Sequence, residues 1–224
     1  MKNPIPLSVE ILVAARTDPP SVERLVPELA ACNPTAISGD AARIAFWVNL
    51  YNALVRTAVR AEGLRGDLRT HRRFFHRAAW KIGDETCSLH VIEHGILRNN
   101  RPAPWTFWRP LSKTDPRLSF APSQLDPRVH FALNCGAVSC PPIRAYDPTA
   151  LDHQLDLATR SYLSGEVSLH GRTLQLPYLC HLYARDFGDR AALLAFIARH
   201  TDIRISHPNP RVTWGPYRWE IVTE

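Results

Sequence analysis

The chain has 224 residues, of which 45% are hydrophobic, and it carries a formal net charge of +6. This composition excludes a disordered chain and supplies enough apolar residues for a sizeable core. The positive charge comes mostly from arginine and forms no long basic run, so we expect no nucleic-acid binding. No stretch of about 20 apolar residues is present, and the N-terminal apolar run is too short for a secretory signal. We therefore expect a soluble, cytoplasmic protein with reduced thiols that does not bind membranes.

Residues 7–31 are predicted to form two short helices separated by Asp18-Pro-Pro20, because proline interrupts one helix and is tolerated at the start of the next. Residues 39–62 give the strongest helix prediction, and Gly63 is expected to end it. This segment is apolar nearly all round, which is typical of a buried helix.

Asn49 and Asn52 lie inside this apolar helix, so their amide groups need hydrogen-bonding partners within the protein. We interpret them as amides that bond to the backbone of nearby loops. The alternative is that one of them orients a catalytic imidazole or contributes to an oxyanion site.

Residues 80–88 have the pattern of a short hairpin, and residues 89–98 are predicted to form a helix. On this helix His90, Glu93 and His94 share one face, because their spacings are three and four residues. The order His-x-x-Glu-His fits an inverted zinc-hydrolase pattern, in which two imidazoles bind zinc and the glutamate acts as a base. The pattern is short and a third ligand is missing, so we expect a metal-free protein.

Residues 99–128 are rich in proline, tryptophan and arginine. A long irregular segment of this kind is often a functional loop, so we expect it to cover the site with its tryptophans packed against the core. The alternative is a segment that only wraps the domain.

Residues 129–134 alternate apolar side chains with polar or small ones, which predicts a buried strand. Cys135 and Cys140 follow in a loop that Gly136 makes flexible and that Pro141-Pro142 stiffens. Reactive groups held at the end of a strand indicate a functional site. The alternative is that Cys135 acts only as a small hydrophobic core residue.

The remaining predicted elements are helices over residues 148–163 and 189–199, a hairpin over residues 167–176, and a closing strand or hairpin over residues 217–222. We predict an α+β fold with a buried central helix packed on a small, mainly antiparallel sheet. No linker divides the chain, so we expect one domain over residues 1–224 with helices 7–31 packed on it.

The segment His130–Pro142 (HFALNCGAVSCPP) resembles the signature of the domain of unknown function 547 family. Segments Ala45–Leu54 and Ile92–Arg98 agree with the family in the same order. The family has no settled activity, so the resemblance implies positions and not a reaction. Weaker matches extend the resemblance to roughly residues 38–219, namely Leu176-Pro177, Tyr183, Asp186-Phe187-Gly188 and Tyr217-Arg218-Trp219, where the family usually has Tyr-Asp-Trp.

We predict a cysteine-dependent hydrolase or acyl-transfer enzyme with a papain-like or transglutaminase-like arrangement. Cys135 is the predicted nucleophile, and His94 is the imidazole that would hold it as a thiolate. Glu93 or Asn134 would orient the His94 ring. The substrate would be a small molecule or a peptide, and we expect no cofactor.

His130 is the second candidate base. In an extended strand His130 and Cys135 point to opposite faces, so His130 serves only if the strand breaks near Asn134. Cys140 is either a resolving thiol or the nucleophile itself. Two other functions stay open: a non-catalytic module that binds a protein or a small ligand, which the fused domains of plant family members imply, and a zinc hydrolase using His90, Glu93 and His94.

Overall fold

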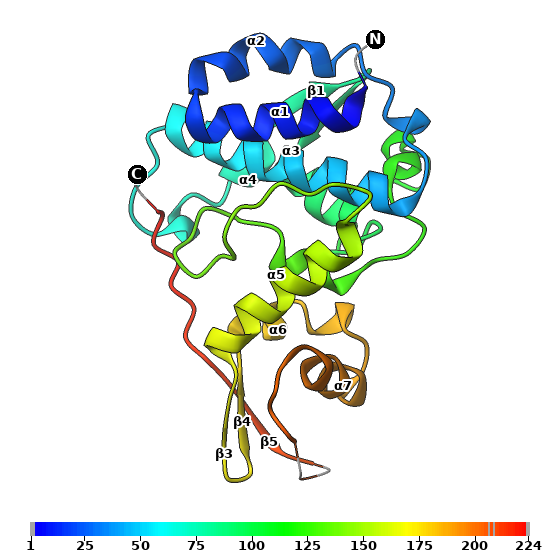
Figure 1. Cartoon of the computed structure of the whole chain (residues 1–224). Coiled ribbons are helices and arrows are strands. Elements are labelled where there is room, and N and C mark those ends of the chain that lie inside the picture. The colour runs from blue at the N-terminus through cyan, green and yellow to red at the C-terminus, as the bar shows by residue number, and fades with distance from the viewer. Residues whose placement is uncertain (1–2, 206, 208, 223–224) are drawn as a thin grey trace.

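The computed structural model describes residues 3–205, 207 and 209–222. Its N-terminal part is built on helix α3 (Asp40–Ala61), in which every residue from Ile44 to Val55 is buried. Helix α1 (Pro4–Thr17) packs on α3, and α2 (Pro19–Leu29) packs on α1 (Figure 1). The three predicted helices are confirmed. A proline begins α2 as expected, and Pro4 begins α1 upstream of the predicted residue 7.

A β-hairpin follows α3, as predicted. Strands β1 (Ala79–Ile82) and β2 (Glu85–Ser88) pair antiparallel around a turn in which Gly83 has a φ of 59°. Short helical turns fill the connections before and after α3: η1 (Pro34–Ala36), η2 (Leu68–Thr70) and α4 (Phe74–Arg77).

The helix predicted over residues 89–98 is present, but it is mainly a π-helix, η3 (Val91–Leu97). Its wider turn appears in the bonds from the Arg98 N–H to the Glu93 carbonyl and from the Asn100 N–H to the Gly95 carbonyl, both 2.9 Å. π-Helices are rare and are frequently found at functional sites. The wider turn does not separate the two imidazoles of the zinc pattern, because the His90 and His94 rings lie edge-on with their centroids 4.9 Å apart.

Residues 99–126 are irregular except for η4 (Pro116–Phe120). The prediction that their tryptophans pack against the core is wrong, because Trp105 is 65% exposed and Trp108 is 83% exposed. Trp105 nevertheless packs against the predicted site residue His94, because the two rings lie edge-on with their centroids 5.8 Å apart.

The strand predicted over residues 129–134 is also wrong. Its place is taken by a 3-10 helix, η5 (Pro127–Phe131), which Asp126 caps by accepting a hydrogen bond from the Arg128 N–H. His130 is 2% exposed and as buried as its apolar neighbours. The alternation of apolar and polar residues over 129–134 therefore does not mark one buried and one exposed face, because His130 is buried too.

The C-terminal part contains helices and a three-stranded sheet. Strands β3 (Ser168–His170) and β4 (Thr173–Leu176) pair antiparallel, whereas β4 and β5 (Arg211–Trp214) pair parallel. The predicted hairpin and last helix are confirmed, but β5 lies upstream of the expected closing strand. The elements are α5 (Leu151–Glu166), β3 (Ser168–His170), β4 (Thr173–Leu176), α6 (Tyr178–Leu182), η6 (Ala184–Asp186), α7 (Arg190–His200) and β5 (Arg211–Trp214).

The α+β class is confirmed, but the central helix does not pack on a sheet. Helix α3 packs chiefly on α1, η3 and α5, as expected for a helix that is apolar all round. No helix in the described part of the chain is long and apolar enough to span a membrane.

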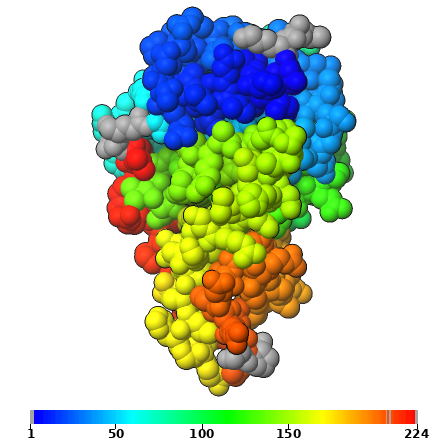
Figure 2. Space-filling view, in the orientation of Figure 1, coloured from blue at the N-terminus to red at the C-terminus, as the bar shows by residue number. Residues whose placement is uncertain are grey.

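The buried side chains form two clusters that meet at η5. Val129 belongs to the larger cluster around α3, whereas Phe131 belongs to the smaller cluster beside α6 and α7. Figure 2 shows the elongated molecule, with the N-terminal helices at one end and the β3–β4 hairpin at the other. The segment after η5 is therefore held at the junction of the two clusters.

Candidate active site at the thiol loop

The loop of residues 134–141, here called the thiol loop, is held by side-chain amides. The Asn52 oxygen accepts a hydrogen bond from the Asn134 N–H, and the Asn52 amide nitrogen donates to the Ala132 carbonyl, both at 2.9 Å. Asn134 then spans the loop, because its oxygen accepts from the Gly136 N–H at 2.8 Å and its nitrogen donates to the Pro141 carbonyl at 2.7 Å. Asn134 thus closes the thiol loop, whereas its predicted role was to orient His94.

Asn49 binds backbone in the same way as Asn52. It bonds to both the N–H and the carbonyl of Tyr146 at 2.9 Å. The interpretation of Asn49 and Asn52 as buried amides that bond to loop backbone is therefore confirmed.

The C-terminal tail forms the other support of the thiol loop. The Val138 N–H donates to the Glu220 carbonyl at 2.9 Å, and the Arg218 N–H donates to the Ser139 hydroxyl oxygen at 2.9 Å. The Arg218 side chain is exposed and only its backbone contacts the loop, which explains why an arginine is accepted there. These bonds place Tyr217 against the two cysteines.

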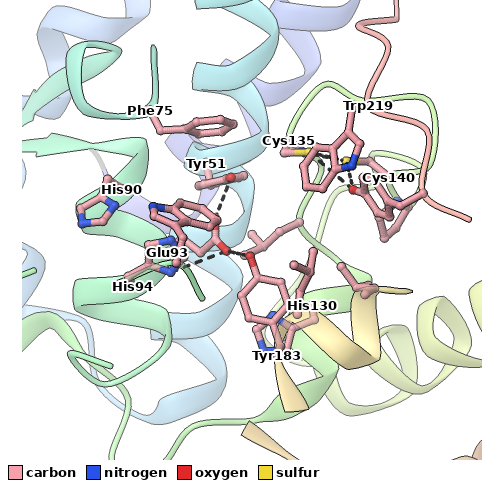
Figure 3. Close-up of a pocket in the computed structure, with 16 residues that line it drawn as sticks. Tyr51, Phe75, His90, Glu93, His94, His130, Cys135, Cys140, Tyr183 and Trp219 are labelled. Carbon is pink, nitrogen blue, oxygen red and sulfur yellow. Dashed lines mark hydrogen bonds and ion pairs between the residues drawn. The ribbon is translucent and has the colours of Figure 1, made fainter. Parts of the chain in front are cut away.

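The two thiols lie in direct contact (Figure 3). The Cys135 and Cys140 sulfurs are 2.7 Å apart, and the Cys135 N–H donates to the Cys140 sulfur at 3.1 Å. The Tyr217 hydroxyl lies 3.2 Å from the Cys140 sulfur and 3.7 Å from the Cys135 sulfur. The Cys140 sulfur is thus surrounded by hydrogen-bond donors.

These contacts separate the pKa values of the two thiols. Burial opposes ionisation of Cys140, but hydrogen bonds from Cys135, from Tyr217 and from the backbone of Cys135 and Ala137 outweigh it and lower the pKa of Cys140. Donation of its hydrogen bond to Cys140 raises the pKa of Cys135, and burial and the negative charge on Cys140 add to this. The arrangement makes Cys140 the more acidic of the two thiols and Cys135 the less acidic.

The thiols face a cavity of about 70 Å³, which has room for a few water molecules or a small organic group. Its walls are aromatic rings, imidazoles and apolar side chains. They comprise Tyr51, Phe75, His90, Glu93, His94, Trp105, His130, Leu133, Cys135, Cys140, Pro141, Leu179, Leu182, Tyr183, Tyr217 and Trp219.

Glu93 forms the polar centre of this cavity together with two tyrosines. Its carboxylate accepts hydrogen bonds from the Tyr51 hydroxyl at 2.8 Å and from the Tyr183 hydroxyl. Burial would raise the pKa of Glu93, but His94, the Tyr183 hydroxyl, Arg98 and the Tyr51 hydroxyl together lower it. The Glu93 oxygen and the His94 Nδ1 are 3.7 Å apart, too far for a hydrogen bond that would orient the ring.

His94 is held by Arg98. The Arg98 guanidinium donates to the His94 Nδ1 at 2.9 Å, so Nδ1 is the acceptor and the ring proton lies on Nε2. Burial lowers the pKa of His94 to about 3, and the Arg98 charge adds to this. His94 is therefore a neutral imidazole near pH 7.

His130 forms a second buried pair. Its Nε2 bonds to the Asp186 carboxylate at 2.9 Å, and its ring stacks on Tyr183 with the centroids 3.9 Å apart. Burial lowers the pKa of His130 despite the Asp186 charge. The Arg98 guanidinium also binds Asp186, at 2.5 and 3.1 Å, so one arginine connects the His94 and His130 pairs.

The structure brings five of the six predicted site residues to one cavity, with Asn134 outside it, but does not pair a thiol with an imidazole. Cys135, Cys140, Glu93, His94 and His130 all line the cavity. Within the described residues, no hydrogen bond joins either cysteine sulfur to a histidine. Figure 3 shows His90 and His94 on the side of the cavity away from the two sulfurs.

The zinc pattern is not assembled either. Within residues 3–205, 207 and 209–222, no three histidine, cysteine, aspartate or glutamate side chains are grouped as a metal site requires. A zinc ion at the His94 Nδ1 would also face the Arg98 guanidinium, which is a cation.

Sequence reasoning missed five residues of this site. They are Tyr51, Arg98, Tyr183, Asp186 and Tyr217. All five lie in segments that resemble the family, which was the available signal. Their roles depend on contacts between segments 40 to 90 residues apart, and no local pattern encodes these contacts.

Comparison with known proteins gives one match. No curated protein and no solved structure matches the chain, so the papain-like or transglutaminase-like arrangement remains a prediction. The sequence profile of a family described as "Protein of unknown function, DUF547" matches residues 34–163, which is more than half of the 224 residues and includes α3, η3 and the thiol loop. The chain belongs to the DUF547 family.

Proposed function

We propose that this domain is a thiol enzyme that exchanges disulfides through the Cys135–Cys140 pair, with Cys140 as the attacking thiolate. The observation that carries the proposal is the 2.7 Å contact between a sulfur with a lowered pKa and one with a raised pKa. A dithiol enzyme needs two thiols of different pKa. The thiolate attacks the substrate disulfide first, and the neutral thiol reacts only in the second step.

The reaction would take two steps. The Cys140 thiolate attacks one sulfur of a substrate disulfide, forms a mixed disulfide and expels the other sulfur as a thiolate, which takes the proton of Cys135 and leaves as a thiol. The Cys135 thiolate then attacks the Cys140 sulfur, forms the Cys135–Cys140 disulfide and expels the second substrate sulfur, which water protonates. The protein loses two electrons and the substrate gains them.

Neighbouring residues would support each step. The Cys135 N–H and the Tyr217 hydroxyl stabilise negative charge on Cys140 before attack. The sulfurs are already in contact, so the second step requires little movement of the thiol loop. The small cavity admits only the sulfur-bearing end of a substrate.

Intact-protein mass spectrometry tests the proposal. The reduced protein is mixed with bis(2-hydroxyethyl) disulfide. We expect the wild type to lose two hydrogens, Cys135→Ser to keep one mercaptoethanol adduct on Cys140, and Cys140→Ser to form no adduct at Cys135. Cys180→Ser is the matched control, because Cys180 is buried and burial raises its pKa to about 12. A wild type that stays fully reduced, or a Cys140→Ser variant with an adduct on Cys135, contradicts the proposal.

The predicted cysteine hydrolase or acyl-transfer enzyme is a second candidate. It is favoured by one observation: a half-buried Cys140 with a lowered pKa shares its cavity with His90, His94 and His130, whose pKa values are all lowered. Cys140 would attack a carbonyl carbon, form a thioester and expel a leaving group, which would take a proton from water or from an imidazole N–H. Water would then attack the thioester and release the acid.

The two candidates differ in their need for Cys135. Hydrolysis of p-nitrophenyl acetate by a single nucleophile should survive Cys135→Ser and be lost in Cys140→Ser. Disulfide exchange through to the internal disulfide requires both thiols. If neither variant differs from the wild type in either assay, the thiol loop is a structural part of a binding module.

A further inference from the structure

Glu93 is a buried carboxylate that the proposed disulfide exchange does not use. It is 8% exposed and lies on η3. Its ion-pair partner in the described part of the chain is His94, 3.7 Å away, which is a neutral imidazole. The Arg98 guanidinium bonds to His94 and Asp186 instead. Among the described residues, the Glu93 charge therefore has no cation in direct contact.

Two tyrosines hold the Glu93 carboxylate and leave part of it free to bind a ligand. Its Oε2 accepts from the Tyr51 hydroxyl at 2.8 Å, and its Oε1 accepts from the Tyr183 hydroxyl. Hydrogen bonds to the ionised form of a carboxylate favour that form. Because a carboxylate offers about four acceptor sites, about two remain open after these bonds.

His130 adds a second acceptor to the same cavity. It lines the cavity and is 2% exposed. Its Nε2 donates to the Asp186 carboxylate at 2.9 Å, so the Nδ1 of the neutral ring is an acceptor. This Nδ1 is buried and has no hydrogen-bond partner among the described residues. A buried acceptor without a donor costs free energy, and a ligand that donates a hydrogen bond removes this cost.

Aromatic rings form much of the cavity wall. They belong to Tyr51, Phe75, Trp105, Tyr183, Tyr217 and Trp219, and in Figure 3 the hydroxyls of Tyr51 and Tyr183 point toward Glu93. The face of an aromatic ring attracts a cation. The protein already uses this interaction, because the Arg98 guanidinium lies 4.9 Å from the centroid of the Tyr183 ring. Aromatic walls also exclude water, which strengthens the attraction between Glu93 and a bound cation.

We propose that this cavity binds a small primary ammonium group, with Glu93 as its counter-ion, and that the thiol pair acts on an amino disulfide. The N–H groups of an ammonium can donate to the open sites of Glu93 and to the His130 Nδ1, which a quaternary ammonium cannot do. A neutral or acidic group would leave the Glu93 charge unpaired. The inference names the substrate class of the same site and in that respect rests on the proposed function.

NMR titration of the full chain with propylammonium chloride tests the binding without any reaction. The indole N–H signals of Trp105 and Trp219 report on the cavity that both residues line, and Trp214, on β5, is the internal control. We expect saturable shifts at Trp105 and Trp219 with propylammonium and none with 1-propanol, its neutral counterpart. The net charge of +6 does not favour a cation. Absence of saturable shifts with propylammonium, or equal shifts with 1-propanol, overturns the proposal.

A charge-removing variant locates the binding. Glu93→Gln keeps the shape of the side chain and should weaken propylammonium binding about tenfold or more, as expected for a lost charge-assisted hydrogen bond. Glu23→Gln removes an exposed negative charge from α2 and should bind like the wild type. Equal weakening by the two variants would show attraction to overall charge and contradict the proposal. If Glu93→Gln does not fold, the wild-type titration decides.

The substrate class is tested with two disulfides that differ only in the terminal group. Cystamine carries an ammonium where bis(2-hydroxyethyl) disulfide carries a hydroxyl, and 2-mercaptoethanol in solution gives the ratio of their intrinsic reactivities. We expect the wild type to prefer cystamine by about tenfold beyond that ratio, and Glu93→Gln to lose the preference. A wild-type ratio equal to that of 2-mercaptoethanol contradicts the substrate class. If neither disulfide oxidises the protein, the proposed exchange is wrong, and the propylammonium titration alone decides whether the cavity binds an ammonium group.

Discussion

The Asn52 side chain in α3 accepts a hydrogen bond from the Asn134 N–H at 2.9 Å, and this bond ties the thiol loop to a helix whose residues 44–55 are all buried. Asn49, one turn earlier in the same helix, binds the Tyr146 backbone with the same geometry. The two amides are equally buried but hold different segments, so they form a matched pair for experiment.

We expect Asn52→Ala and Asn49→Ala to destabilise the protein by similar amounts, about 1–3 kcal/mol each, because each leaves buried backbone groups unpaired. Only Asn52→Ala should slow the alkylation of Cys140, since only Asn52 positions the thiol loop. Urea unfolding and iodoacetamide kinetics measure the two effects. Equal alkylation rates in the two variants would mean that Asn52 has no influence on the thiols.

The burial of α3 predicts large effects of truncation. Phe46 and Leu50 are both 0% exposed, so alanine at either position should cost about 2–5 kcal/mol through lost apolar contacts and the remaining cavity. Val13 is 48% exposed and provides the control, because Val13→Ala should change the free energy of unfolding by less than about 0.5 kcal/mol. Chemical denaturation checks both values, and a loss below about 1 kcal/mol at Phe46 and Leu50 is incompatible with the fold.

The cavity histidines predict instability in acid. Burial lowers the pKa of His90 to about 4, and His76 and Arg98 lower it further, whereas the unfolded chain titrates near 6.5. Between these pH values the unfolded state binds more protons, so the stability that a neutral His90 contributes is present above pH 6.5 and is lost as the pH falls towards 4. His94 acts in the same direction down to about pH 3.

We expect the melting temperature to fall as the pH is lowered from 6.5 to 4, and His90→Gln to reduce this slope because glutamine does not titrate. Differential scanning calorimetry across this range provides the measurement. His153→Gln is the control, since His153 is exposed. A wild-type slope that His90→Gln leaves unchanged would exclude His90 as a source of the acid sensitivity.

The zinc hypothesis and the observed contacts predict different responses to removal of metal ions. Arg98 donates to the His94 Nδ1, and two tyrosine hydroxyls bind Glu93, so we expect the purified protein to keep its fold and melting temperature in the presence of EDTA. Elemental analysis is the check. Stoichiometric zinc that disappears in His90→Ala would restore the zinc hydrolase as the better hypothesis.

The sequence predicted those parts of the fold that depend on local signals. The apolar composition of residues 44–55 predicted the buried helix, and Gly83 predicted the hairpin turn. The strand at residues 129–134 was wrong because a histidine normally marks an exposed position, whereas His130 is buried by its bond to Asp186. Asp186 follows His130 by 56 residues, so no local sequence pattern indicates that the two side chains bond.

The candidate site was predicted by residue type but not by arrangement. Both thiols, Glu93, His94 and His130 do line one cavity. The contact of Tyr217 with Cys140 joins residues 77 positions apart, so no local signal indicates it. The contact of Arg98 with His94 has a spacing of four residues, and the sequence analysis overlooked it. The assignment of the nucleophile to Cys135 remains a prediction, and the hydrogen bonds to Cys140 favour Cys140 instead.

The central claim is that Cys140 is the more acidic thiol of the pair and ionises before Cys135. Tyr217→Phe provides the supporting variant, because loss of the hydroxyl removes a donor to the Cys140 sulfur and should raise its pKa. Cys87 and Cys180 are internal references, since both are buried and burial raises the pKa of each to about 12.

The most direct measurement is the rate of iodoacetamide alkylation at each cysteine between pH 5 and 9, followed by peptide mass spectrometry. The structure predicts that Cys140 reacts at a lower pH than Cys135 and faster than every other cysteine, and that Tyr217→Phe moves its pH profile upward. Alkylation of Cys135 before Cys140, or a native protein in which both stay unreactive until it is unfolded, would contradict the assignment.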